Sequence, residues 1–296
     1  MSKLLELFGV STSSKEPVKW QEVVDNRWCP FLERLCLKGR KSQPNILIGS
    51  CSVSYSRKSL PIIICPHRLL ERQQLFTDCL HLLTLHEPGN ELHIVSEVGI
   101  PGGSVDYFVV SANKGKVRDF VGVELQTLDT TGTVWPERQR FLLENGLPAA
   151  RKDAESKKTF GMNWMMNAKT ILIQLHNKVV TFEDINKKLV LVLQDPFMEY
   201  MRNTFVFDEV TDARLGDSMH FHAYSFSATE RGLWRLELAH RYSTSAAGVA
   251  KSLGQRAEAK VELEEIVSLL EAKISDATLF NFAHPVTDVT PTTPPS

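Results

Sequence analysis

Residues 104–126, SVDYFVVSANKGKVRDFVGVELQ, constrain the fold of this chain more than any other stretch. Side chains in 104–110 alternate between two faces, which is the period of a β-strand. Residues 120–126 are rich in β-branched side chains and keep the same period of two. The connection at 111–119 contains the sequence NKGK, whose residue types are typical of a hairpin turn. The stretch therefore predicts two antiparallel strands joined by a polar turn.

The antiparallel arrangement brings three polar side chains to one end of the predicted hairpin. Asp106 lies near the start of the first strand, and Glu124 and Gln126 lie near the end of the second. Two carboxylates and an amide at one sheet end suit a divalent metal ion. Acidic residues at strand ends are usually only solvated, so spacing alone leaves that alternative open. Glu124, however, interrupts the apolar run FVGVELQTL, where a buried carboxylate is costly unless it is paired or binds a metal.

Length and composition set the outer limits. The chain has 296 residues, 43% of them hydrophobic, which allows one large domain or one domain with an appended module. No apolar run approaches the ~20 residues that cross a bilayer. The apolar patch at 4–10 is too short for a signal peptide and lacks a small-residue cleavage site. We therefore expect a soluble cytoplasmic protein without a membrane segment.

The net charge of −1 hides a local imbalance. Residues 27–72 contain nine basic residues and only two acidic ones, Glu33 and Glu71, which gives a surplus of seven positive charges. The basic residues are Arg27, Arg34, Lys38, Arg40, Lys41, Arg57, Lys58, Arg68 and Arg72. Such a surplus is a plausible contact surface for a phosphate backbone. Charge alone equally allows a solvated basic face with no ligand.

The same segment contains four of the five cysteines: Cys29, Cys36, Cys51 and Cys65. Each stands at an expected turn or strand end. In a cytosolic protein such clustering favours a metal over disulfides, and a tetrahedral thiolate site would hold zinc or iron. The spacing is not that of a paired C-x2-C motif, so ordinary buried cysteines remain the alternative. Cys79 lies on an apolar helical face and is predicted to belong to the core.

Periodicity and breaker residues predict the remaining elements. Expected helices cover 3–8, 66–86, 137–145, 164–178, 246–253 and 256–274. Expected strands cover 45–48, 61–64, 91–98, 188–193, 205–207 and 219–226. The 188–193 run, KLVLVL, is apolar throughout, as in a buried central strand. The 164–178 helix is expected to face inward with Met165, Ala168, Ile171, Leu172 and Leu175. Residues 285–296 read as a disordered tail.

Other candidate functional residues have ordinary explanations. Trp135 follows the polar loop 127–135 and is more often a packing residue than a base-stacking platform. His220 and His222 flank Phe221 and are metal-ligand candidates without a visible third ligand, so surface or packing histidines are favoured. The chain contains neither a phosphate-cradling glycine loop nor a dinucleotide fingerprint. No nucleotide cofactor is expected.

Two separate groups of motifs resemble the NotI family of type II restriction endonucleases. SEVGIPGGSVDYFVVS followed by DFVGVELQTLDTTGTVWP is similar to the catalytic core of that family. The CPF, GSCSV and ICPHR boxes around Cys29, Cys51 and Cys65 are similar to its N-terminal metal-binding part. The resemblance covers roughly residues 27–255, with both groups in the family's order.

The resemblance implies an α/β (α+β) restriction-endonuclease-like fold, with a mixed β-sheet flanked by helices and a small N-terminal four-cysteine metal-binding module. It implies Mg²⁺-dependent cleavage of double-stranded DNA at a specific palindromic site by a homodimer. Asp106 and Glu124, with the carbonyl of Leu125, take the metal-binding positions. Cys29, Cys36, Cys51 and Cys65 take the positions of a structural iron or zinc site.

The match departs from the wider PD-(D/E)XK nuclease pattern at two positions. Val105 precedes Asp106, so the PD dipeptide is missing, and Gln126 occupies the place usually held by lysine. Gln126 brings no positive charge and is expected to orient the attacking water. Lys169 is a candidate for the missing charge. Glu71 and Glu97 are candidates for a further acidic ligand.

The expected domain organisation has four parts: an N-terminal extension at 1–26, a cysteine-bearing, DNA-contacting module at 27–65, a nuclease domain at 66–284 and the tail at 285–296. Two other functions stay open on the residues. Because Gln126 replaces lysine, the chain is alternatively a non-cleaving DNA-binding protein on a nuclease-like fold. A repair-type nuclease without sequence specificity is the third possibility.

Overall fold

The computed structural model describes residues 2–40, 43–56, 58–253 and 263–280. The strands are β1 (Leu4–Leu7), β2 (Val10–Ser11), β3 (Trp28–Cys29), β4 (Arg34–Leu35), β5 (Gly39–Arg40), β6 (Gln43–Leu47), β7 (Ser50–Tyr55), β8 (Leu60–Ile63), β9 (Glu91–Ile100), β10 (Gly103–Asn113), β11 (Lys116–Gln126), β12 (Thr130–Gly132), β13 (Phe160–Met162), β14 (Lys188–Gln194), β15 (Thr211–Asp212), β16 (Met219–Ala228) and β17 (Trp234–Thr244). The helices are α1 (Trp20–Asn26), α2 (Gln74–Cys79), α3 (Trp135–Glu144), α4 (Arg151–Ala154), α5 (Trp164–Asp184), α6 (Asp195–Thr204), α7 (Ala246–Ser252) and α8 (Leu263–Glu271), with 3₁₀ turns η1 (Pro66–Gln73), η2 (Leu80–Leu82) and η3 (Asp276–Thr278).

The centre of the molecule is a seven-stranded mixed sheet in the order β15-β17-β16-β14-β11-β10-β9. Strand β14 runs parallel to both β11 and β16, whereas the pairs β9–β10, β10–β11 and β16–β17 are antiparallel. All seven residues of β14 are buried, as the run KLVLVL predicted for a central strand. The expected mixed sheet flanked by helices is confirmed.

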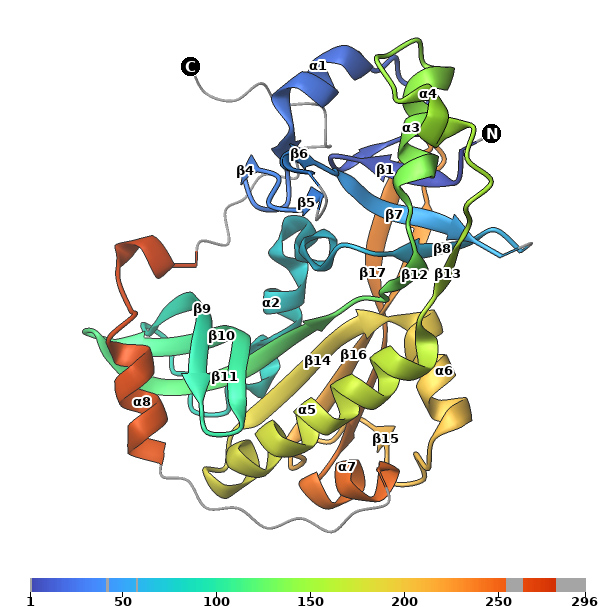
Figure 1. Ribbon diagram of the computed structural model, residues 1–296. Coiled ribbons are helices and arrows are strands. Elements are labelled where there is room, and N and C mark those ends of the chain that lie inside the picture. The colour runs from blue at the N-terminus through green and yellow to red at the C-terminus, as the bar shows by residue number, and fades with distance from the viewer. Residues whose placement is uncertain (1, 41–42, 57, 254–262, 281–296) are drawn as a thin grey trace.

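Hydrophobic clusters cover both faces of this sheet. Helix α5 crosses one face, in front of β14 and β16 in Figure 1, and packs through Phe182 on Phe108 and Phe120. The opposite face is covered by η1 and α2, where Phe76 and Cys79 join the second cluster. The sheet is thus enclosed on two sides, and a polar group on either face needs a partner.

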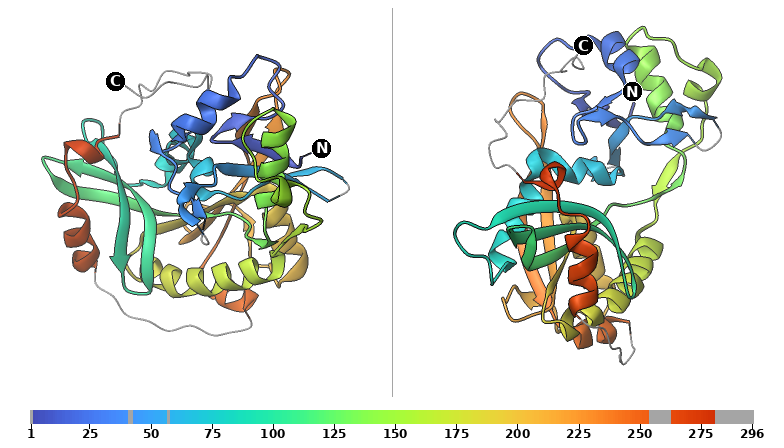
Figure 2. Two further views of the ribbon diagram at one scale, coloured as in Figure 1. Left: turned by 45° about the horizontal axis from the view of Figure 1, so that its top comes forward. Right: turned by 90° about the vertical axis from the view of Figure 1, so that its left-hand side faces the viewer.

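A smaller sheet in the order β2-β1-β7-β8 forms beside the large one. Its first two strands come from the first 26 residues, and its other two come from the cysteine-bearing segment. The right-hand view of Figure 2 shows this sheet with α1, α3 and α4 at one end of the molecule and the large sheet at the other. The N-terminal extension and the cysteine segment therefore share one sheet.

Three predicted elements are wrong. Residues 3–8 form strand β1 instead of a helix, because pairing with β2 and β7 outweighs the weak propensity of a short segment. The helix expected at 66–86 is broken into η1, α2 and η2, since Glu71 and Arg72 have non-helical backbone angles. The apolar run at 205–207 follows α6 without forming a strand.

Strand β17 was not predicted at all. Its first half alternates, with Trp234, Leu236 and Leu238 apolar and Arg235 and Glu237 charged, and the three apolar side chains pack against the second cluster. A strand signal of period two was therefore present in the sequence. Of the helix expected at 256–274, the described residues show α8. The predicted tail at 285–296 lies outside the described residues. Within the described chain, no helix has the length and apolar character required to cross a membrane.

Candidate active site

The predicted hairpin is formed by β10 and β11. Asn113 pairs with Lys116, and the two residues between them, Lys114 and Gly115, have φ angles of +52° and +73°. Two consecutive residues with positive φ match the twist of paired strands, as in the tight turns of β-hairpins. The strands are therefore longer and the connection shorter than the stretch 111–119 suggested.

The register brings Asp106 beside Glu124. Tyr107 pairs with Val123, so the next pair toward the open end of the hairpin joins Asp106 to Glu124. The N–H of Leu125 donates a 2.9 Å hydrogen bond to Oδ2 of Asp106, and the N–H of Asp106 donates to the carboxylate of Glu124. The two carboxylates are thus held from both strands at one sheet end.

Glu124 is buried, with only 5% of its surface exposed. Burial and the charge of Asp106 together raise the pKa of Glu124 to about 7, although Lys178 and the N–H of Asp106 act in the opposite direction. Because burial disfavours the ionised form, a cation close to this carboxylate is strongly stabilising.

Lys178 on α5 pairs with Glu124. Its Nζ atom lies 2.7 Å from Oε1 of Glu124, and only 7% of the lysine is exposed. Sequence reasoning did not single out this residue, although the inward positions Ala168, Ile171 and Leu175 continue to 178 at helical spacing. The helix also extends beyond the predicted end, to Asp184. Its predicted inward face is correct except at Met165, which is 41% exposed.

Two glycines allow α5 to approach the hairpin. Gly102, with φ +95°, lies so close to the helix that an added Cβ would stand 2.5 Å from the carbonyl oxygen of Asn177. Gly122 is on the same strand face as Glu124, and an added Cβ there would stand 2.4 Å from Cζ of Phe182. Both contacts exclude any larger side chain without movement of the helix or the ring, so Lys178 reaches Glu124 because these positions are glycine.

Gln126 lies two residues beyond Glu124 on the same strand. Its Nε2 donates a 2.6 Å hydrogen bond to the carbonyl of Thr127. The amide nitrogen is therefore engaged by the neighbouring backbone, and the side chain is partly exposed. A neutral amide in this position offers hydrogen bonding and no charge.

Lys169 and Glu97 do not contact this pair. Lys169 is exposed and lies nine residues before Lys178, which places the two on opposite sides of α5. Glu97 stands level with Asp106, between the paired positions Ser96 and Val98 of β9, but its side chain is exposed and its φ is +54°. Within the described residues, the cation on Glu124 comes from Lys178.

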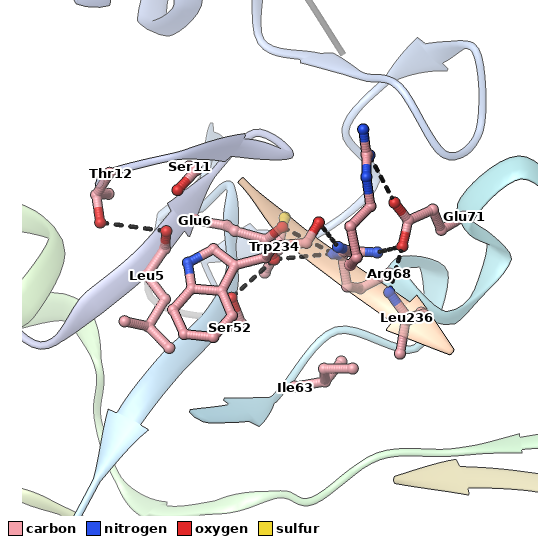
Figure 3. Close-up of polar contacts among 12 residues, drawn as sticks. Leu5, Glu6, Ser11, Thr12, Ser52, Ile63, Arg68, Glu71, Trp234 and Leu236 are labelled. Carbon is pink, nitrogen blue, oxygen red and sulfur yellow. Dashed lines mark hydrogen bonds and ion pairs between the residues drawn. The ribbon is translucent and has the colours of Figure 1, made fainter. Parts of the chain in front are cut away.

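Glu71 belongs to a separate buried network around Arg68 (Figure 3). Arg68 is 1% exposed, and its Nε lies 2.8 Å from Oε1 of Glu6 while its Nη1 lies 2.9 Å from Oε2 of Glu71. Arg235 and the N–H of Leu236 also bind Glu71. These partners lower the pKa of Glu71 against the effect of burial. Glu71 is thus a structural carboxylate.

The cysteines of the N-terminal segment are free thiols. Cys29, Cys51 and Cys65 are buried, and Cys36 is partly exposed. Burial raises the pKa of Cys29 to about 11, and the neighbouring thiols Cys65 and Cys36 add to that rise. Cys51 also lies near Cys65 and Cys29. Within the described chain, however, no group of three or more His, Cys, Asp or Glu side chains is placed to hold a metal ion.

Backbone N–H groups point at three of these sulfur atoms. Phe31 and Leu32 donate to Cys29, and His67 and Arg68 donate to Cys65. Gly9 donates to Cys51. Donors aimed at sulfur stabilise a thiolate, which is the form that binds metals. The chemistry of the donor set therefore fits a soft metal ion, although the thiols do not stand in a ligand cluster.

His220 and His222 are packing residues. Both are at most 1% exposed, and burial lowers the pKa of His220 to about 4. His222 lies 3.9 Å from the sulfur of Cys79, which is fully buried as expected. The His81 ring stacks on His222 at 6.0 Å. The pair therefore stays neutral in the core, which is the packing role and not the surface role of the two that the sequence left open.

Trp135 also packs. Its indole N–H donates a 2.7 Å hydrogen bond to Oδ2 of Asp153. The guanidinium groups of Arg40 and Arg138 lie 4.2 and 5.0 Å from the centre of the ring. The ring is 7% exposed, so bases have no access to its faces.

Two basic residues of the cysteine segment act on the surroundings of Asp106. Burial, Arg34 and Lys38 lower the pKa of His67, while Asp106 opposes them. Asp106 also raises the pKa of Tyr107, whereas Arg34 lowers it. Charges of this kind act over short distances. Arg34 and Asp106 therefore both influence His67 and Tyr107, and Lys38 influences His67.

Comparison with known proteins identifies one family. The family described as restriction endonuclease NotI matches residues 28–228, about two thirds of the chain. No curated protein matches the sequence. The matched stretch contains the four N-terminal cysteines as well as Asp106, Glu124 and Gln126.

Proposed function

We propose a metal-dependent DNA cleavage mechanism for this chain, which belongs to the NotI family of restriction endonucleases. Family membership implies site-specific cleavage of DNA. The finer proposal is hydrolysis of phosphodiester bonds in double-stranded DNA at a palindromic site, with Mg²⁺ held at the open end of the β10–β11 hairpin. The observation that carries it is the juxtaposition of Asp106 and Glu124 across the hairpin.

Asp106, Glu124 and the carbonyl of Leu125 would hold the metal. Carboxylate and carbonyl oxygens are the ligands that Mg²⁺ prefers in proteins. A divalent ion bound there would supply an acidic bound water and would stabilise charge on the phosphate oxygens. The buried Glu124, whose charge is uncompensated except by Lys178, gains most from a cation.

Gln126 orients the attacking water in this proposal. Its side chain lies beyond Glu124 on the same strand, and its amide nitrogen is held by the carbonyl of Thr127. The amide oxygen is the atom left to accept a hydrogen bond from water. Gln126 therefore positions a nucleophile without adding charge.

The four cysteines Cys29, Cys36, Cys51 and Cys65 are proposed to bind one structural iron or zinc ion. Support comes from the electrostatic effects of these thiols on one another and from the backbone donors aimed at three sulfur atoms. Metal binding would release the protons that burial retains on the thiols. The four sulfur atoms would then surround the ion in a tetrahedral arrangement. Metal analysis of the pure protein should give about one iron or zinc per chain. Retention of that metal by Cys51→Ser would contradict the assignment.

The DNA contact is proposed to include Arg34, Lys38 and Arg40 of the cysteine segment. Arg34 and Lys38 act on residues next to Asp106, so phosphate held by them would lie near the carboxylate pair. Each chain supplies one carboxylate pair, and cutting both strands of a palindrome symmetrically calls for a homodimer. A monomer both in solution and on DNA would refute the dimer.

The function is tested by incubating the purified protein with a large sequenced DNA and Mg²⁺. Discrete fragments with common ends, absent in EDTA, are expected. Smeared products would instead indicate a nuclease without sequence specificity. Binding without cleavage in Mg²⁺ and Mn²⁺, on methylated and unmethylated DNA, would favour a non-cleaving DNA-binding protein, the reading suggested by Gln126.

A further inference from the structure

We infer that Lys178 is the positively charged positioning residue of the candidate active site and acts through Glu124. This inference rests on the proposed function, because it assumes that Asp106 and Glu124 hold the metal. It assigns to helix α5 a charge that the strand position of Gln126 does not provide.

The geometry is specific. Lys178 Nζ lies 2.7 Å from Oε1 of Glu124, and both side chains are at most 8% exposed. A buried ammonium group is costly unless it is paired, so its placement requires Glu124. The bound carboxylate is the one beside Asp106, at the open end of the hairpin. A lysine that served only to stabilise the fold would not need to end at this pair.

The backbone is built to allow the contact. Pro101 accepts a 3.0 Å hydrogen bond from Thr181 of α5, and Gly102 lets the helix approach within van der Waals distance. An added Cβ at Gly103 would stand 3.2 Å from Cε of Lys178 itself. The turn before β10 therefore packs closely against the part of α5 that carries Lys178. This contact fixes the position of the lysine ammonium group relative to Asp106.

Formal charges explain what Lys178 contributes. With both carboxyl groups ionised, Asp106 and Glu124 carry two negative charges and Lys178 one positive charge, which leaves the three side chains with one net negative charge. A divalent cation turns this into one net positive charge, which suits a phosphodiester that gains negative charge as water attacks. With a neutral residue at 178 the loaded site would have no net charge.

The same charge count predicts that loss of Lys178 changes metal affinity and cleavage rate in opposite directions. Without Lys178 the two carboxylates attract a cation more strongly, so metal binding tightens. The loaded site then stabilises the reacting phosphate less, so cleavage slows. A lysine with only a structural role would weaken both together, because loss of the fold disrupts the metal site as well.

The experiment compares Lys178→Gln, Lys178→Met and Lys178→Arg with the matched control Lys169→Gln on the opposite side of α5. For each variant we would measure single-turnover cleavage in Mg²⁺, Mn²⁺ binding to the free protein and DNA binding in Ca²⁺. Lys178→Gln, which keeps a hydrogen-bond donor for Glu124 without the charge, should cleave roughly 100-fold more slowly. Its Mn²⁺ affinity should rise roughly tenfold, with DNA binding retained.

Lys178→Arg should recover most of the cleavage rate, and Lys169→Gln should leave all three quantities unchanged. Cleavage by folded Lys178→Gln at a rate close to the unmodified enzyme would overturn the inference. Parallel loss of Mn²⁺ binding and cleavage in all three Lys178 variants would also overturn it and indicate a structural role. If Lys178→Met does not fold, the comparison of Gln with Arg gives the same decision.

Failure of the inference and failure of the proposed function give different results. Glu124→Gln removes a metal-binding carboxylate and should lose both Mn²⁺ binding and cleavage. If Glu124→Gln cleaves normally, the proposed metal site is wrong. If Glu124→Gln is inactive while Lys178→Gln is fully active, only the role of Lys178 is wrong.

Discussion

At the scale of single residues, the partner of a buried charge can come from a distant part of the chain. Glu124 lies in an apolar run of β11, and its partner Lys178 comes from a helix 54 residues later in the chain. Antiparallel geometry was enough to predict that Asp106 and Glu124 are neighbours. The lysine was not predictable in the same way, because a charged residue at the assumed end of a helix is normally solvated. Only the continued inward spacing of α5 signalled its burial.

The buried His220 makes stability depend on pH. Its folded pKa of about 4 lies below the ordinary value of 6.5, so the unfolded chain binds more protons between these values. The stability contribution is therefore present above pH 6.5 and is lost as pH falls toward 4. The loss amounts to about 3 kcal/mol. Urea unfolding of the metal-free protein across this range measures it.

His220→Gln is the matched variant, since its amide can donate to the carbonyl of Asp217 that His220 Nε2 contacts. Its stability should depend less on pH between 4 and 6.5 than that of the unmodified protein. Equal pH dependence in both proteins would show that His220 does not remain neutral in the fold.

At the scale of elements, the contact between α5 and the hairpin positions the site. Phe182 fills the space over Gly122, two residues before Glu124 on the same strand face. Sequence periodicity predicted both elements, since each has a regular apolar pattern. It did not predict the closeness of their contact, which depends on how the Phe182 ring fits over a residue without a side chain.

Gly122→Ala should therefore destabilise the protein and slow cleavage. The added methyl group would overlap the Phe182 ring, and overpacking of this kind costs about 1–3 kcal/mol. Chemical unfolding and single-turnover cleavage provide the two measurements. Combining Gly122→Ala with Phe182→Leu should restore part of the stability, because the leucine leaves room for the methyl group. Additive losses in the double variant would contradict direct contact.

At the scale of the whole molecule, the Arg68 network joins elements from three parts of the chain. Arg68 of η1 binds Glu6 of β1 and the carbonyl of Trp234 at the start of β17. Ser52 of β7 also donates to Glu6. These contacts link the N-terminal sheet to the large sheet. Local patterns do not predict them, because positions 6, 68 and 234 lie in separate elements and share no periodicity.

Arg68→Met should lower the free energy of unfolding by about 3–5 kcal/mol, because it leaves the buried Glu6 without its cation. Urea denaturation measures the loss. Adding Glu6→Gln should recover part of it. Lys251→Met, which breaks the exposed pair with Glu209, is the control and should change stability little. An equal loss of stability in Arg68→Met and Lys251→Met would contradict the role of the buried network.

The most direct test of the proposed metal site is Asp106→Ala, assayed for cleavage in Mg²⁺ and for DNA binding in Ca²⁺. Asp106 is proposed to hold the metal, and its carboxylate receives the N–H of Leu125 at the open end of the hairpin. We expect Asp106→Ala to abolish cleavage while the fold and DNA binding are largely retained. Full cleavage by Asp106→Ala would contradict the assignment of the hairpin as the catalytic site.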